Sequence, residues 1–160
     1  MQPRYLDAGE SALVVEFGQN VDPALNDRVL ALDTALAQAQ LPGLRELVPT
    51  YRSLMVHYDP LRLPRAVLIE TIEACLQAAT GPARAARRWQ LPCHYGNPYG
   101  DDLEEMAALL GLSATRAAEL HAGATYRVYM YGFSPGFAYL GGLPAVSYTH
   151  LRAHETVLDL

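Results

Sequence analysis

The sequence predicts an α+β protein in which strands and helices alternate, and three observations support this class. Short runs of β-branched and apolar residues, such as Ser11 to Phe17, are typical of strands. Segments in which apolar residues recur every three or four positions, such as the one that begins at Pro23, are typical of amphipathic helices. Proline and glycine stand between these segments, as at Pro42-Gly43, and mark the element boundaries.

The first helix has clear signals at both ends. Asp22 is expected to be its N-cap and Pro23 its first residue, because proline is tolerated where no intrahelical N–H bond is needed. Pro42-Gly43 is expected to end it. The apolar face would contain Leu25, Val29, Leu32, Leu36 and Ala39.

Two strands and a second helix follow. Residues 44–49 and 54–58 are close enough in sequence to form an antiparallel pair. Pro64 is expected to open a helix, and residues 89–95 are expected to form a further strand. The resulting order, β-α-β-β-α-β, is that of a ferredoxin-like split βαβ unit, so we expect a first domain over residues 1–82.

A second domain is expected over residues 83–145. Asp101 with Glu104 matches a capping box at the start of one helix, and Ser113 is placed to cap the next. Residues 125–131 alternate as a strand does.

Residues 131–144, YGFSPGFAYLGGLP, are expected to form a shaped loop. Fourteen residues hold four glycines and two prolines, which neither a helix nor a central strand tolerates. Pro135-Gly136 fits the corners of a type II turn. The loop either fills its own core or presents backbone amides to a ligand, with the rings of Phe133, Phe137 and Tyr139 packed on one side.

The composition excludes several classes of protein. The net charge is −5, no lysine is present and the arginines are scattered, which argues against nucleic-acid binding. Cys75 and Cys93 are too few for a disulfide framework, and no metal site is evident from the residue pattern. No apolar run reaches the roughly 18 residues of a membrane span and no signal peptide is evident, so we expect a cytoplasmic protein.

The last residues, 146–160, are expected not to be native. Val146 to Thr156 reads VSYTHLRAHET, and one codon choice for it matches a transposase adapter used in sequencing-library preparation. We therefore interpret the chain as truncated near Ala145 and leave the tail, including His150 and His154, out of the functional argument.

The shaped loop also carries a resemblance. Gly132 to Pro144 reads GFSPGFAYLGGLP, and it is preceded by YGNPYGDDLEEMAALLGLS at 95–113 and ELHAGATYRVYMYGF at 119–133. These segments resemble the carboxyltransferase-type family that contains the B component of 5-oxoprolinase, allophanate hydrolase subunit 1 and a histidine-kinase inhibitor. The resemblance implies that an incomplete cyclophilin-like β-barrel follows the first domain.

It also implies a function. The first expectation is the B component of an ATP-dependent 5-oxoprolinase, a hydrolase that opens the cyclic amide 5-oxo-L-proline to L-glutamate with the C and A components of the complex. ATP is then a co-substrate of the complex, and the truncated chain alone is expected to be inactive. The alternatives are allophanate hydrolase subunit 1 and a non-enzymatic histidine-kinase inhibitor.

The same resemblance selects candidate site residues. His121 and Asp102 are the candidate catalytic residues, although each also fits a role at a helix end. The candidate substrate-binding residues are Tyr95, Phe133, Pro135, Gly136, Phe137, Tyr139 and Gly141.

Overall fold

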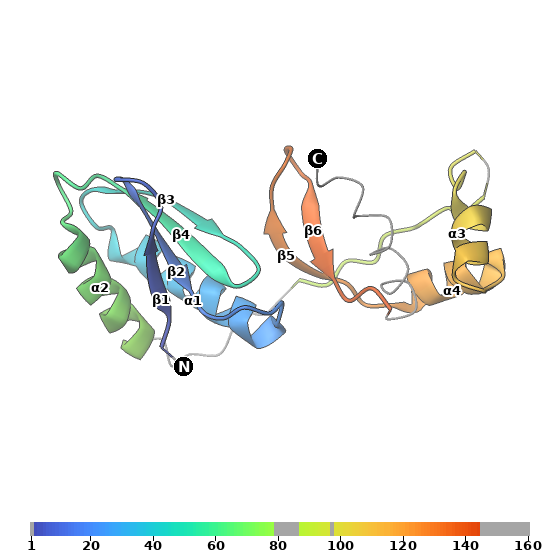
Figure 1. Ribbon diagram of the computed structural model, residues 1–160, viewed down its shortest axis with the longest axis horizontal. Helices are drawn as coiled ribbons and strands as arrows, with labels where there is room; N and C mark the ends of the chain where they lie inside the picture. Colours follow the sequence, from blue (N-terminus) through green and yellow to red (C-terminus); the bar gives the residue numbers. More distant parts are fainter. Residues whose placement is uncertain (1, 79–86, 97, 145–160) are drawn as a thin grey trace. The chain divides into compact units, whose positions relative to one another are not determined.

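The computed structural model describes residues 2–78, 87–96 and 98–144 (Figure 1). These residues form two compact units: 2–78 with 129–139, and 87–128 with 140–144. The elements, in chain order, are β1 (Arg4–Asp7), β2 (Ala12–Glu16), α1 (Pro23–Ala39), β3 (Leu44–Pro49), β4 (Ser53–Tyr58), α2 (Arg65–Ala78), α3 (Leu103–Leu109), α4 (Ala114–Gly123), β5 (Arg127–Tyr131) and β6 (Ala138–Gly141).

The first unit is a four-stranded antiparallel sheet covered on one face by α1 and α2. The strand order is β1-β2-β4-β3, and the register places Leu13 opposite Val56 and Val15 opposite Leu54. Alternate residues of β2 and β4 are buried, so one face of the sheet meets the helices. The core is completed by Val29, Leu32 and Leu36 of α1 and by Leu68 and Ile72 of α2.

The signals predicted for α1 are confirmed. Asp22 accepts a hydrogen bond from the Ala24 amide at 2.7 Å, and Pro23 is the first helical residue. The helix ends slightly before the predicted stop, at Gln40, which adopts φ 46°. Local sequence therefore determines this helix.

The predicted order β-α-β-β-α-β differs from the structure in two places, so the ferredoxin-like description is not confirmed. Residues 89–95 form no strand: Pro92 cannot donate to a ladder, and Trp89 and Leu91 are more than two-thirds exposed. The sequence prediction also missed β1, a four-residue edge strand of mostly polar residues that pairs with β2. Residues 2–78 are therefore arranged as ββαββα, and the class remains mixed α and β.

The edge strand β3 is irregular. Its register with β4 shifts between Leu44 and Glu46, which leaves one extra residue, Arg45, in the edge strand. Arg45 forms an ion pair with Asp59 at 3.1 Å. Pro49 ends the strand.

The second unit contains the helices α3 and α4. Ser113 caps α4 as predicted, because its Oγ accepts from the Arg116 amide at 3.2 Å. The predicted capping box at Asp101 is wrong: the N-cap of α3 is Asp102, and its side chain makes no capping bond. The strand predicted at 125–131 is confirmed as β5.

The described residues contain one further sheet, the two-stranded ladder of β5 and β6. The cyclophilin-like barrel and the domain boundary after residue 82 therefore stay predictions. The foreign tail expected at 146–160 lies outside the described residues. Within the described ranges, no helix has the length and apolar character of a membrane span.

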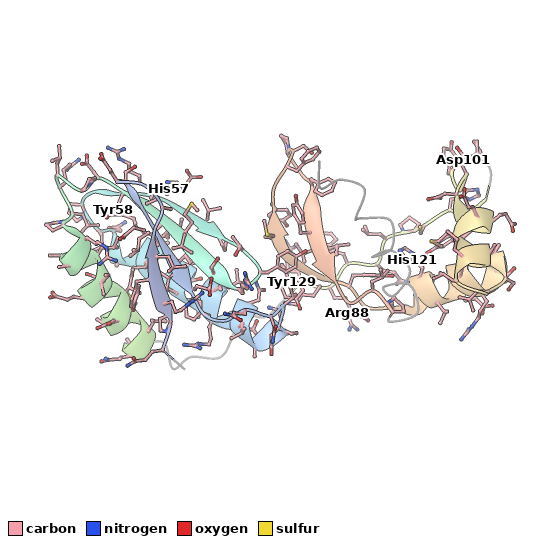
Figure 2. The ribbon with its side chains drawn as sticks, in the orientation of Figure 1. His57, Tyr58, Arg88, Asp101, His121 and Tyr129 are labelled. Carbon is pink, nitrogen blue, oxygen red and sulfur yellow. The ribbon has the colours of Figure 1, made fainter. Side chains whose placement is uncertain are left out.

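Asn26 joins three segments of the first unit. Its side chain lies on α1 and is fully buried among the apolar core residues. Nδ2 donates to the carbonyl of Thr50, in the β3–β4 turn, at 3.1 Å and to that of Tyr129, on β5, at 3.4 Å. Tyr129 is labelled in Figure 2. A buried amide with these partners fixes the turn and the strand against the helix.

We expect Asn26→Ala to lower the free energy of unfolding of the chain by about 2 kcal/mol, because a buried carbonyl and a partly buried one lose their donor. The measurement is urea unfolding followed by circular dichroism. Asn20→Ala, at an exposed position, is the matched control and should leave the midpoint unchanged. Equal stability of the two variants would contradict the role of Asn26.

Tyr5 has a polar atom that folding leaves unsatisfied. Its hydroxyl is buried and makes no hydrogen bond to the described residues. Burial, with Glu73 nearby, raises the pKa of this phenol. The Tyr5 ring packs against the core, so the hydroxyl rather than the ring is the unfavourable part.

We therefore expect Tyr5→Phe to raise the free energy of unfolding by about 1 kcal/mol, since it removes an unpaired hydroxyl and keeps the ring. The change is measured by the same urea titration. Tyr99→Phe, at a residue that is 78% exposed, serves as the control. A loss of stability in Tyr5→Phe would show that the hydroxyl has a partner.

Candidate functional site

The predicted type II turn is present in the loop that joins β5 to β6. The Phe137 amide donates to the Ser134 carbonyl at 3.0 Å, which closes a four-residue turn over Pro135 and Gly136. Gly136 has φ 79°, the value that a type II turn requires at its second corner. The pattern Pro-Gly was therefore read correctly, although residues 138–141, expected as loop, form β6.

Phe133, next to this turn, has an unusual backbone conformation. Its φ is 66°, and the Ser134 amide donates across it to the Gly132 carbonyl at 2.8 Å. This is a γ-turn with positive φ, which is rare and costly for a residue with a side chain. The phenyl ring is 90% exposed. The turn thus holds a large apolar ring in solvent at an energetic cost.

The aromatic residues of the loop form a continuous series of ring contacts. Phe133 meets Phe137 with centroids 5.6 Å apart, and Phe137 meets Tyr139 at 5.3 Å. Tyr139 in turn meets Tyr51 at 6.4 Å, and Tyr51 meets the buried Tyr129 at 5.0 Å. The expected packing of the rings is confirmed. Tyr51 was not expected to take part, since it lies in the distant β3–β4 turn.

The loop has fewer available amides than the sequence suggested. The amides of Gly132, Ser134 and Phe137 already donate to carbonyls of the same loop. What the loop mainly exposes is therefore an aromatic surface.

In the second unit, Tyr95 and His121 are brought together. The Tyr95 hydroxyl lies 2.5 Å from Nδ1 of His121, in the last turn of α4, and the two rings meet edge to face. The hydroxyl of Tyr126 donates to the backbone carbonyl of His121 at 3.0 Å, and its ring lies 5.3 Å from the imidazole. The sequence analysis did not identify Tyr126, because nothing in the residues around it indicates a contact with His121.

The environment of Tyr95 favours the protonated phenol. Burial, then a hydrogen bond to the Cys93 side chain and the negative charge of its ionised form, and then the charge of Tyr126, raise the pKa of Tyr95 to about 12. Burial and Cys93 also raise the pKa of Tyr126. At neutral pH both phenols are hydrogen-bond donors, and a thiol and an imidazole lie beside them.

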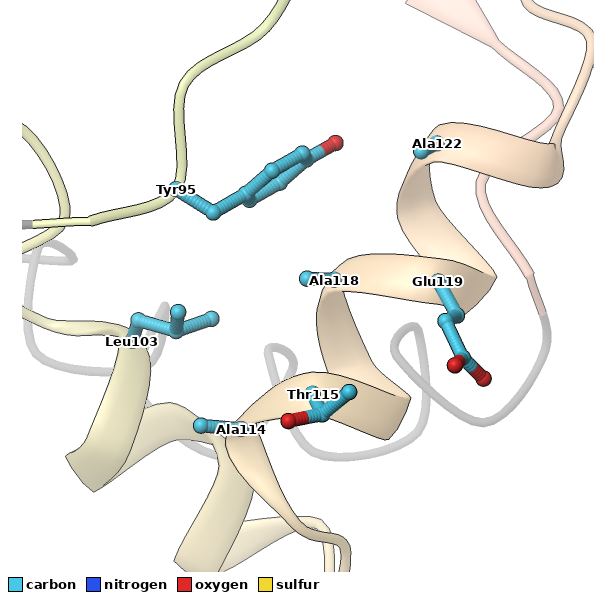
Figure 3. Close-up of a pocket in the computed structure, with 7 residues that line it drawn as sticks. All are labelled: Tyr95, Leu103, Ala114, Thr115, Ala118, Glu119 and Ala122. Atoms are coloured by element: carbon cyan, nitrogen blue, oxygen red, sulfur yellow. The ribbon is translucent and has the colours of Figure 1, made fainter.

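A groove of about 470 Å³ lies beside Tyr95 (Figure 3). The Tyr95 ring faces the side of α4 that carries Ala118 and Ala122. The remaining lining residues are Leu103, Ala114, Thr115 and Glu119. Alanines at successive turns of α4 leave room for the ring and keep this wall of the groove apolar.

Of the other predicted site residues, Asp102 and Gly141 belong to the second unit and the rest to the first. Asp102 begins α3 and is exposed, and in the described part of the chain it is not a partner of the His121 ring. Gly141 ends β6. Pro135 and Gly136 form the exposed corners of the turn. No three His, Cys, Asp or Glu side chains among the described residues are grouped as a metal site.

The raised pKa of Tyr95 predicts a late step in an alkaline titration. Between pH 10 and about 12 the folded chain keeps a proton that the unfolded chain has lost, so folding weakens as the pH rises through this window. The difference in tyrosinate absorbance between the parent chain and Tyr95→Phe should appear only near pH 12, the upper end of this window. A difference that is already complete at pH 10 would show that the pKa of Tyr95 is not raised.

Comparison with known proteins gives consistent results. The family described as the carboxyltransferase domain, subdomain C and D, matches residues 3–154. A Bacillus subtilis protein named as the B component of 5-oxoprolinase is 32% identical over 84% of this chain and 61% of its own length. An Escherichia coli O157:H7 protein of the same name is 34% identical over 94% of this chain and 68% of its own length.

A solved structure supports the fold. The crystal structure of TTHA0988 is 38% identical, with a TM-score of 0.72, over 85% of this chain and 26% of that one. The chain spans about three-fifths to two-thirds of the length of the two curated relatives. It belongs to the family of carboxyltransferase domains that comprises subdomains C and D.

Proposed function

We propose that this chain acts as part of the B component of an ATP-dependent 5-oxoprolinase, which opens 5-oxo-L-proline to L-glutamate together with the C and A components. The observation that carries this proposal is the similarity to the Escherichia coli O157:H7 protein named as the B component of 5-oxoprolinase. The two are 34% identical, and this chain covers 68% of the length of that protein. Two separate features supply candidate groups: the exposed aromatic loop offers ring faces, and Tyr95 with His121 offers hydrogen bonds.

The reaction is the addition of water across the amide bond of a five-membered ring. The C–N bond breaks, the carbonyl carbon becomes a carboxylate and the nitrogen leaves as an amine. An amide carbonyl is a poor electrophile, and coupling to ATP hydrolysis supplies the driving force. Hydrogen-bond donors around the carbonyl oxygen stabilise the negative charge that develops there.

The residues of this chain suit recognition better than nucleotide chemistry. The chain has no lysine and no GxxxxGK[ST] motif, so phosphate contacts fall to arginine, to backbone amides or to the partner proteins of the complex. In our proposal, the rings of Phe133, Phe137 and Tyr139, with Pro135, Gly136 and Gly141, provide a substrate-binding surface. Tyr95 and His121 supply hydrogen bonds, and Asp102 has an auxiliary catalytic role.

The direct test uses the full-length protein purified with the C and A components of the complex. Glutamate release from 5-oxo-L-proline should require ATP and should stop when the C component is left out. Allophanate serves as the competing substrate. Ammonia release from allophanate, without glutamate release from 5-oxo-L-proline, would replace this proposal with allophanate hydrolysis, and activity with neither would favour a non-enzymatic role.

Phe133→Gly separates the function of the loop from its folding. Glycine adopts φ 66° without strain, so the variant should be at least as stable as the parent. Loss of the ring should lower glutamate release roughly tenfold, equivalent to about 1.4 kcal/mol. Thermal unfolding of the variant is the control, and undiminished turnover would remove Phe133 from the proposed binding surface.

A further inference from the structure

The contact between Tyr95 and His121 joins a phenol to an imidazole ring. The phenol oxygen lies 2.5 Å from Nδ1. Either group can donate, and the tautomer of the imidazole decides which one does. With Nδ1 unprotonated, the phenol O–H donates to it.

The alternative direction would require a weaker arrangement. If Nδ1 carried the proton, the phenol would accept from it and would have to direct its own proton elsewhere, with the Cys93 thiol nearby as a poor acceptor. An unprotonated imidazole nitrogen is a far better acceptor than a phenol oxygen. Because Tyr95 keeps its proton up to about pH 12, the donor is present at neutral pH.

A neutral imidazole carries one N–H, so accepting at Nδ1 leaves the proton on Nε2. The His121 residue is exposed, and Tyr126 restrains its backbone through the 3.0 Å bond to the carbonyl and its ring through an aromatic contact. Two phenols on different segments therefore hold one imidazole, one through the ring nitrogen and one through the backbone.

We propose that Tyr95 holds His121 as the Nε2-protonated tautomer, and that this N–H donates a hydrogen bond to a carboxylate or amide carbonyl oxygen of a small ligand. His121 then acts as a neutral donor, and Nδ1 is not available as a general base. Tyr95 is a positioning residue, because it acts through the imidazole. The identity of the ligand as 5-oxo-L-proline rests on the proposed function, whereas the tautomer does not.

Nitrogen NMR of the intact chain tests the tautomer without any assay of activity. The chain has five histidines, and the signals of His121 are those that disappear in His121→Gln. At neutral pH we expect a protonated Nε2 and an unprotonated Nδ1. A protonated Nδ1 would overturn the proposal.

Two variants test which phenol sets the tautomer. Tyr95→Phe removes the donor to Nδ1 and should turn the nitrogen shifts of His121 into those of a tautomer mixture. Tyr126→Phe is the matched control, because its hydroxyl binds the carbonyl rather than the ring, and it should leave the protonated Nε2 in place. An unchanged tautomer in Tyr95→Phe would overturn the role of Tyr95.

Activity of the full-length complex tests the donor. The amide N–H of glutamine can replace Nε2–H, whereas that of asparagine lies near the Nδ1 position. His121→Gln should therefore keep turnover within about threefold, and His121→Asn should lower it roughly tenfold to a hundredfold, the effect of losing one hydrogen bond to a charged group.

Equal loss in both variants would indicate proton transfer by the imidazole, and no loss in either would remove His121 from the site; both outcomes overturn the donor role. If the parent complex releases no glutamate, the proposed function fails, and the NMR measurements still decide the tautomer.

Discussion

The side-chain amide of Asn26 is the constraint on which the arrangement of the first unit depends. It is a polar group in an otherwise apolar core, and it satisfies carbonyls of Thr50 and Tyr129, which lie 24 and 103 residues away in sequence. A buried amide has a strongly directional demand for partners, unlike an apolar contact. It therefore fixes how β5 and the β3–β4 turn lie against α1, where apolar packing alone would allow them to slide.

The aromatic loop inherits its placement from this arrangement. Tyr129 is buried and stacks on Tyr51, and Tyr51 meets Tyr139, from which the ring contacts continue to the exposed Phe133. One end of the series is anchored in the core and the other lies in solvent. The site in the second unit is built differently, since hydrogen bonds from Tyr95 and Tyr126 hold His121 at the end of α4.

The sequence predicted the features that depend on neighbouring residues. Asp22 and Ser113 as caps, and the turn at Pro135-Gly136, follow from the geometry of a few consecutive residues. The sequence could not reveal features that depend on distant partners. Tyr5 in β1 gains its place by pairing with β2. Residues 89–95 have strand-like composition but form no strand.

The candidate site shows the same division. The aromatic loop was recognisable because its residues are contiguous, as was the candidacy of Tyr95 and His121. Their direct contact was not, because 26 residues separate them. The participation of Asn26 and Tyr51 was equally hidden, since an asparagine on a helix and a tyrosine in a turn have no distinctive pattern. The positive φ of Phe133 depends on the closure of the hairpin.

The irregular edge of β3 affects how copies of this protein meet one another. An open sheet edge offers unpaired amides and carbonyls, and a straight edge can join that of a second molecule. The extra residue at Arg45 disturbs the spacing of those groups, its charge resists burial, and Pro49 withholds an amide at the end of the strand. These features oppose edge-to-edge aggregation, so the first unit can expose this side of its sheet without seeding amyloid-like assembly.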